Sequence, residues 1–177
     1  MVSINTQEQF REQVQPYIRC GERVAEIYHG ERDDILNNLS DLVGEEGVVY
    51  GIDQLNPFPW HQNMVGLQRL RNVRLIRARI PRVQEEVSHL NAVIIRELLW
   101  TQYDGGEKES GVFEPSNSVY RWLDSIIEGG GYFIIAFKEG EAETEWNGIC
   151  QTVVRLHLPN FTRIFRGHKA LVYKKPE

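Results

Sequence analysis

The sequence alternates short apolar segments with segments of helical spacing, and its last two apolar segments are too close together to have a helix between them. Alternation of this kind is typical of a parallel sheet with helices on both faces. A connection as short as the last one favours an antiparallel hairpin. The expected strands are 23–29, 48–53, 73–80, 91–96, 132–137, 161–167 and 169–174. The sequence therefore predicts an α/β fold with a doubly wound, mostly parallel, seven-stranded sheet that ends in an antiparallel hairpin, a Rossmann-like arrangement.

Apolar residues at helical spacing, together with capping residues, indicate helices between these strands. The expected helices are 6–19, 33–43, 60–70, 118–128 and 143–156, with a short helix or turn at 83–89. The glycine run at 129–131 is expected to end a helix before the next strand begins. The 177 residues fit a single domain spanning 1–177, with an N-terminal helix within 1–20. The segment 103–118, rich in glycine, serine and charge, is a candidate lid loop.

The composition is that of a protein that folds around an apolar core in water. Hydrophobic residues make up 41% and charged residues 25%, and the net charge of −5 does not favour nucleic-acid binding by the whole surface. Residues 1–15 lack an apolar signal core, and no run approaches the roughly 18 apolar residues of a membrane span. Cys20 and Cys150 are far apart and predict free thiols in a reducing compartment. We therefore expect a cytoplasmic protein with no membrane partner, and an oligomer stays open.

Several short segments, in the same order along the chain, resemble one family. The helix end at 40–44 and the strand at 47–53 match best, and the segments 72–76, 130–135 and 169–176 follow them. They resemble the class I S-adenosylmethionine-dependent methyltransferases, in particular the fibrillarin and ribosomal RNA 2′-O-methyltransferase group. The resemblance implies the fold described above, S-adenosylmethionine as cofactor, and methyl transfer to RNA or a small molecule.

Open parallel sheets bind ligands at the carboxyl ends of their strands, where the strand order reverses. In the resembling family this point lies beside the first strand and holds the methyl donor. Asp53 is expected to accept hydrogen bonds from both ribose hydroxyls, with a simple turn-forming role as the alternative. The other expected donor contacts are His29, Gly30, Ile52, Gln54, Ala78 and Arg79.

The turn after the first strand departs from the family pattern. Gly30 is its single glycine, whereas the family has several small residues there, so the glycine loop is degenerate. Glu31, Asp33 and Asp34 put negative charge at the start of the next helix, which suits the helix dipole and disfavours a phosphate. S-adenosylmethionine carries a cationic sulfonium and no phosphate, so it is compatible with this loop. Alternatively, these acids only cap the helix.

The residues expected to act on the methyl acceptor follow the fourth and fifth strands. Glu97 and Lys138 loosely match an acid and a lysine with which some 2′-O-methyltransferases activate a ribose hydroxyl. Arg96 and Glu97 stand where the family's fourth strand commonly ends in Asp. Since methyl transfer can work mainly by positioning, two functions stay open. One is an active methyltransferase, and the other is a catalytically inactive methyltransferase-like binding or scaffold protein.

Arginines crowd the stretch from 69 to 82. They are Arg69, Arg71, Arg74, Arg77, Arg79 and Arg82. This run could bind a nucleic-acid backbone, which makes RNA a candidate partner. It could instead protect an exposed edge strand from aggregation, since the third strand is expected at a sheet edge. The five histidines show no metal-ligand spacing, so no metal site is expected.

Overall fold

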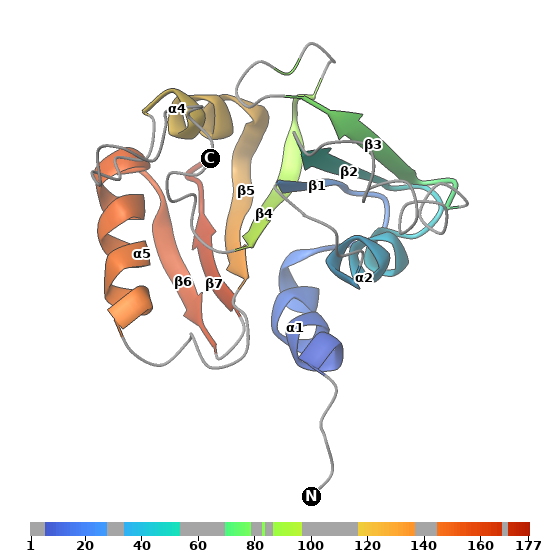
Figure 1. The fold of residues 1–177 in the computed structure, drawn as a ribbon, viewed down its shortest axis with the longest axis horizontal. Coiled ribbons are helices and arrows are strands. Elements are labelled where there is room, and N and C mark those ends of the chain that lie inside the picture. The colour runs from blue at the N-terminus through green and yellow to red at the C-terminus, as the bar shows by residue number, and fades with distance from the viewer. Residues whose placement is uncertain are drawn as a thin grey trace, which may run out of the picture.

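The computed structural model describes residues 6–27, 34–53, 70–78, 83, 87–96, 117–136, 145–167 and 170–177. Its centre is a seven-stranded sheet in the order β3-β2-β1-β4-β5-β7-β6 (Figure 1). The strands are β1 (Arg23–Ile27), β2 (Val48–Asp53), β3 (Val73–Arg77), β4 (Leu90–Arg96), β5 (Ile127–Ala136), β6 (Thr162–Arg166) and β7 (Ala170–Lys174). Neighbouring strands are parallel except at β7, which is antiparallel to both β5 and β6. The predicted doubly wound sheet and its terminal hairpin are confirmed.

Helices cover both faces of this sheet. They are α1 (Thr6–Val14), the 3-10 helix η1 (Gln15–Tyr17), α2 (Asp34–Val43), α4 (Asn117–Ile126) and α5 (Glu145–His157). α1 and α2 contribute Phe10, Val14 and Leu39 to a buried cluster that also contains Val24 and Val172 of the sheet. Because side chains alternate along a strand, the neighbouring residues of β1 and β7 point to the opposite face.

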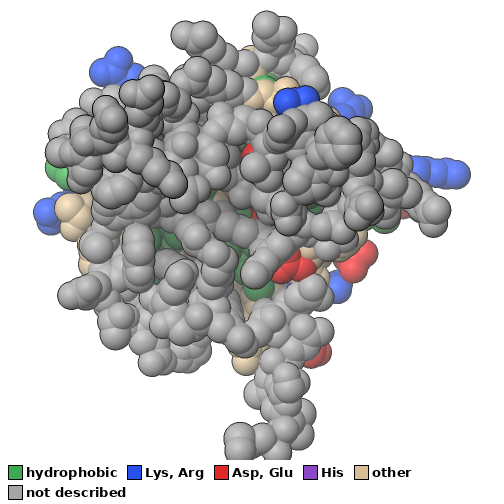
Figure 2. All heavy atoms as spheres, in the orientation of Figure 1, with side chains coloured by type: hydrophobic (Ala, Val, Ile, Leu, Met, Phe, Trp, Pro, Cys, Tyr) green, Lys and Arg blue, Asp and Glu red, His purple; other side chains and the backbone are tan. Residues whose placement is uncertain are grey.

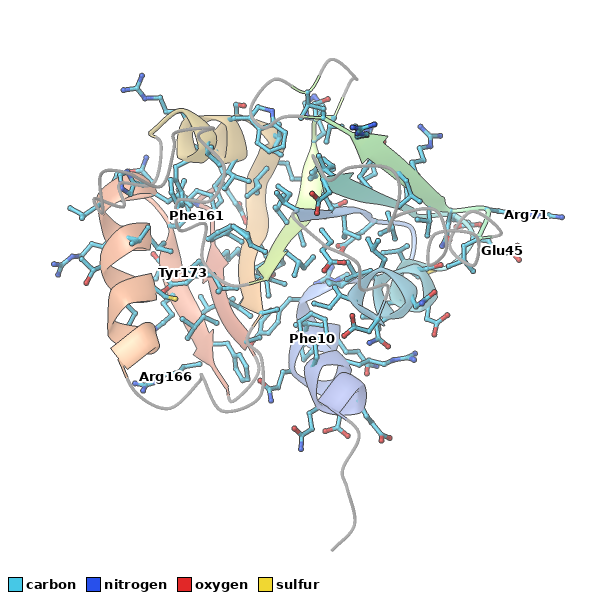
Figure 3. All side chains as sticks on the ribbon, viewed as in Figure 1. Phe10, Glu45, Arg71, Phe161, Arg166 and Tyr173 are labelled. Carbon is cyan, nitrogen blue, oxygen red and sulfur yellow. The ribbon has the colours of Figure 1, made fainter. Side chains whose placement is uncertain are left out.

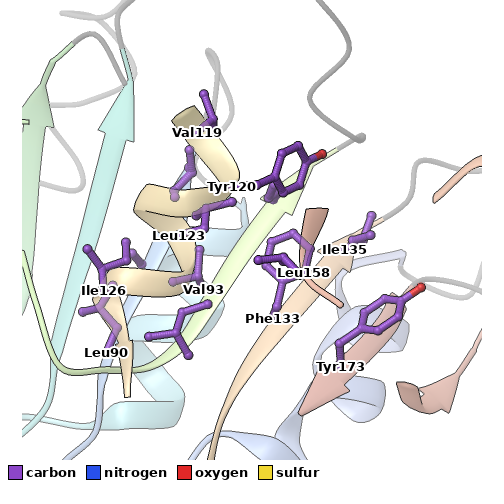
Figure 4. Packing of buried hydrophobic residues seen from close by; sticks show 14 of the residues in the cluster. Leu90, Val93, Val119, Tyr120, Leu123, Ile126, Phe133, Ile135, Leu158 and Tyr173 are labelled. Carbon is purple, nitrogen blue, oxygen red and sulfur yellow. The ribbon is translucent and has the colours of Figure 1, made fainter. Parts of the chain in front are cut away.

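The opposite face is covered by α4 and α5. Figure 4 shows Leu123 and Ile126 of α4 packed with Val93 and Phe133 of the sheet. Leu123 and Phe133 have no exposed surface, and full burial of such a side chain is worth about 1.5–3 kcal/mol. The two apolar layers hold the sheet between them, which fixes the carboxyl ends of the strands relative to one another.

The first helix is shorter than predicted. The expected helix at 6–19 ends at Val14, and Gln15–Tyr17 continue as a 3-10 turn with Pro16 near its start. Proline has no backbone N–H to donate and disfavours helical backbone at the residue before it. The tyrosine at the end of this turn still packs inward, where the Tyr17 ring lies 5.5 Å from that of Tyr132.

The glycine run at 129–131 does not end a helix, contrary to the prediction. α4 ends at Ile126, and the three glycines lie inside β5, which begins at Ile127 rather than at 132. Gly130 has a φ of 77°, a backbone conformation that glycine adopts without strain. A Cβ at Gly131 would lie 3.0 Å from the backbone oxygen of Asn91 in β4. The run therefore bends β5 and lets it lie close to β4, where the ladder register also shifts.

Several other predicted bounds differ by a few residues. β3 ends at Arg77 instead of 80, β4 begins one residue early, and residues 83 and 87–89 form neither helix nor strand. Residues 60–69 of the predicted helix at 60–70 lie outside the described residues. Residues 103–116 of the candidate lid loop at 103–118 lie outside them as well. Among the described helices, none is long and apolar enough to cross a membrane.

A polar contact joins the end of α2 to the turn before β3. The side chain of Asn72 donates to the backbone oxygens of Ser40 (3.0 Å) and Gly44 (2.8 Å), and it accepts a hydrogen bond from the Ser40 hydroxyl (2.6 Å). Gly44, with a φ of 67°, ends the helix in the left-handed conformation typical of a helix C-terminus. These bonds give the segment 40–44 and Asn72 a structural role, because they hold the end of α2 against the edge of the sheet.

Candidate functional site

The carboxyl ends of β1, β2 and β3 meet at the point where the chain order reverses. β1 lies between β2 and β4, so the chain leaves it in one direction towards β3 and in the other towards β5. Ile27, the last residue of β1, is level with Ile52 of β2 and Ile95 of β4. Open parallel sheets bind ligands in the crevice outside such a point. This is therefore the candidate site of the fold.

Asp53 ends β2 within this site. It is only 2% exposed, and Ile52 beside it is completely buried. The backbone N–H of Ala78 donates to the backbone oxygen of Asp53 at 2.9 Å, so the end of β3 is held against the end of β2. The structure thus brings together three of the predicted donor contacts, Ile52, Asp53 and Ala78.

A second buried acid, Glu26, was not predicted as a site residue. It has no exposed surface and lies one residue before the end of β1, level with Gly51 of β2 and Ile94 of β4. Alternation along the strands places it on the same sheet face as Asp53, which is the face covered by α2. Its sequence signal is one acid inside the otherwise apolar segment from Val24 to Ile27. Two buried acids therefore lie on one sheet face at the point where the chain order reverses.

Close packing of α2 on β2 depends on Gly51. A Cβ there would lie 2.8 Å from Leu75 Cδ2 and 3.0 Å from Leu36 Cδ1 of α2. The absence of a side chain lets α2 lie near the sheet between the two buried acids. Asp34, in the first turn of α2, carries the negative charge that the positive end of the helix dipole favours.

The remaining predicted site residues lie outside the described residues. They are His29, Gly30, Gln54, Arg79, Glu97 and Lys138, and their roles stay predictions. Within the described part of the chain, no three His, Cys, Asp or Glu side chains gather into a group that could hold a metal ion.

Comparison with known proteins places this fold. No protein-family model matches the chain, and no curated protein is similar to it in sequence. Among solved structures, it is similar to an S-adenosylmethionine-dependent methyltransferase from Aquifex aeolicus, with a TM-score of 0.65 at 14% identity, over 96% of this chain and 88% of the other. It is also similar to Aeropyrum pernix fibrillarin with natively bound S-adenosyl-L-methionine, with a TM-score of 0.65 at 15% identity, over 96% and 76% of the two chains.

A third similar structure is a precorrin-6y C5,15-methyltransferase from Geobacter metallireducens, with a TM-score of 0.64 at 12% identity, over 100% of this chain and 93% of the other. These likenesses cover almost the whole chain. The chain therefore has the fold of the class I S-adenosylmethionine-dependent methyltransferases, as the sequence resemblance implied.

Proposed function

We propose that this protein is an S-adenosylmethionine-dependent methyltransferase that binds its donor at the carboxyl ends of β1, β2 and β3. The observation that carries the proposal is the buried carboxylate of Asp53, at the end of β2 and beside the strand where the chain order reverses. A carboxylate in this position can accept hydrogen bonds from both hydroxyls of a ribose. Ala78 at the end of β3 is half-buried and provides apolar surface for an adenine ring, whereas Ile52 is completely buried in the layer under α4 and α5.

The charge of the site fits this donor better than a phosphate-bearing nucleotide. When bound, the donor supplies a methyl group on a cationic sulfonium. Glu26 and Asp53 are both buried acids on the α2 face of the sheet. Asp34, with Glu31 and Asp33 expected before it, puts negative charge at the start of α2, where it disfavours a phosphate. In this proposal Asp53 orients the ribose, Glu26 contributes negative potential, and His29, Gly30, Gln54 and Arg79 complete the donor contacts.

The acceptor side of the site belongs to the residues after β4 and β5. Glu97 follows directly on Arg96, the last residue of β4, and Lys138 lies two residues after the last residue of β5. We assign Glu97 to accept a proton from the acceptor and Lys138 to orient it. The acceptor is RNA or a small molecule.

Cys20 and Cys150 form no disulfide, which supports the proposed cytoplasmic location.

The test is a calorimetric titration of the wild-type protein with S-adenosylmethionine, S-adenosylhomocysteine and NAD. We expect heat with the first two ligands and none with NAD, because the acids at the start of α2 disfavour a phosphate there. No heat with millimolar S-adenosylmethionine would contradict the proposal. Donor binding without transfer of a labelled methyl group to any acceptor in an RNA and metabolite extract would indicate the catalytically inactive binding protein instead.

A further inference from the structure

One edge of the sheet carries three arginines at a spacing of three residues. β3 pairs only with β2, and Arg71, Arg74 and Arg77 lie in the turn before it and within it. All three are exposed, and we call them the β3-edge arginines. Because side chains alternate along a strand, Arg74 and Arg77 project to opposite faces. The three cations therefore follow the edge and flank it on both sides.

These arginines are not neutralised by the described residues. Arg11 pairs with Asp41 at 3.4 Å and Lys175 with Asp124 at 3.0 Å, but no described carboxylate forms an ion pair with a β3-edge arginine. Arg74 lies over the ring of Tyr50, 6.0 Å from its centroid, which leaves its charge in place. Figure 3 shows Arg71 projecting outward at the corner of the molecule, and Figure 2 shows lysine and arginine side chains at the rim of this view. In a protein of net charge −5, this edge carries local positive charge.

The positive charge and the length of this edge indicate which kind of partner it can bind. A strand rises about 3.3 Å per residue, so the three arginines are spread over at most roughly 20 Å along this edge, on both sides of it. A nucleic-acid backbone carries one negative charge per nucleotide along its length, and guanidinium groups bind phosphate oxygens in pairs. The edge of the sheet is one strand wide, which fits a single nucleic-acid strand, whereas a duplex needs a broader surface. We propose that the β3-edge arginines bind the phosphodiester backbone of a single-stranded nucleic acid.

This edge leads to the proposed donor site. Arg77 is level with Asp53 in the ladder, and β3 is two strands from β1. Since neighbouring strands lie about 4.8 Å apart, β3 itself lies roughly 10 Å from β1, and a nucleic-acid strand held by its arginine side chains lies farther out. Only one part of this inference rests on the proposed function, namely that the bound nucleic acid is the methyl acceptor. Binding itself requires no donor.

The opposite edge offers a matched control. Arg163 and Arg166 of β6, four strands from β1, are also exposed, as is Arg155 of α5. They are interspersed with exposed apolar side chains, since Leu156 is 66% and Ile164 is 43% exposed. Neutralising these three removes the same charge from the protein without touching the β3 edge.

The experiment measures binding of a fluorescent uridine 12-mer by anisotropy, at several salt concentrations and without donor. The triple variant Arg71→Gln, Arg74→Gln and Arg77→Gln is expected to bind at least 10-fold more weakly than wild type. With about three phosphates neutralised, the slope of log K against log salt is expected to be roughly −2 in wild type and near zero in this variant. The control variant Arg155→Gln, Arg163→Gln and Arg166→Gln is expected to bind within about twofold of wild type.

Three further arms complete the test. A thymidine 12-mer of DNA is expected to bind through the same arginines, because the proposal concerns the backbone. Equal weakening in both triple variants, or an unchanged salt slope in the β3-edge variant, would overturn the proposal. Poly-glutamate that binds as tightly and depends on the same arginines would overturn it too, because the edge would then dock an acidic protein. Nucleic-acid binding in a protein that gives no heat with donor would refute the proposed function while this inference stands.

Discussion

Replacing Asn72 tests how the edge strand beside the candidate site is held. Its side chain makes three hydrogen bonds that join Ser40 and Gly44, at the end of α2, to the turn before β3. A hydrogen bond contributes about 0.5–1.5 kcal/mol net. The groups are half-buried, so water recovers part of the loss. We expect Asn72→Ala to lower the free energy of unfolding by about 2 kcal/mol.

The assay is urea unfolding followed by circular dichroism, with the thermal midpoint as a second reading. For a protein of this length, about 2 kcal/mol corresponds to a midpoint lowered by roughly 4–8 °C. Asn72→Asp keeps the acceptor for the Ser40 hydroxyl but replaces both donated bonds with a carboxylate facing helix-end carbonyls. We therefore expect Asn72→Asp to be less stable than Asn72→Ala. The control is Asn37→Ala, an exposed change on α2 that should stay within about 0.5 kcal/mol of wild type.

Two results would refute this reasoning. One is an Asn72→Ala protein within about 0.5 kcal/mol of wild type, which would mean that the three bonds add nothing over hydration. The other is an Asn72→Asp protein as stable as Asn72→Ala, which would mean that the side chain does not face the carbonyls at the end of α2.

Two further predictions concern buried and half-buried polar groups. Burial raises the pKa of Tyr173 to about 12, and no described group hydrogen-bonds its hydroxyl. Between pH 10 and about pH 12 the phenol ionises in the unfolded chain but not in the folded one. The free energy of unfolding is therefore unaffected below pH 10 and falls by about 1.4 kcal/mol per pH unit as the pH rises from 10 to 12. Tyr173→Phe should match or exceed wild type at pH 7 in urea unfolding and lack this loss, and equal pH slopes would contradict the prediction. Lys175 Nζ donates to the backbone oxygens of Asp124 and Ile127 at the end of α4, so Lys175→Met should cost about 1–2 kcal/mol. In thermal unfolding Lys174→Met should cost less, and equal loss in both would show that the α4 contacts are not responsible.

The order of elements was predictable from local pattern, because buried parallel strands are apolar throughout. β2 has its predicted bounds, and the close spacing of β6 and β7 indicated the hairpin. The local pattern does not determine the order of the strands in space, and the family resemblance implied that order. The end of α1 at Val14 was missed although Pro16 signals it.

Tertiary contacts explain what the sequence did not show. The glycines at 129–131 look like a helix stop, but Gly131 is needed where β5 approaches Asn91 in β4. Glu26 was missed because one acid in an apolar segment has no meaning until the segment is known to be the strand at the chain reversal. Asp53 was predicted to end a strand, and it does. Its ribose-binding role, which the family resemblance implies, stays a prediction.

The central claim is that Asp53 belongs to a donor-binding site. Its most direct test is a calorimetric titration of S-adenosylmethionine into wild type, Asp53→Asn and the control Asp41→Asn, which changes an exposed acid of α2. Hydrogen bonds to a charged group are worth about 1.5–3 kcal/mol, so Asp53→Asn should bind roughly 10–150-fold more weakly. Asp41→Asn should bind like wild type. A folded Asp53→Asn protein with wild-type affinity, or a wild-type protein that binds no donor, would contradict the account.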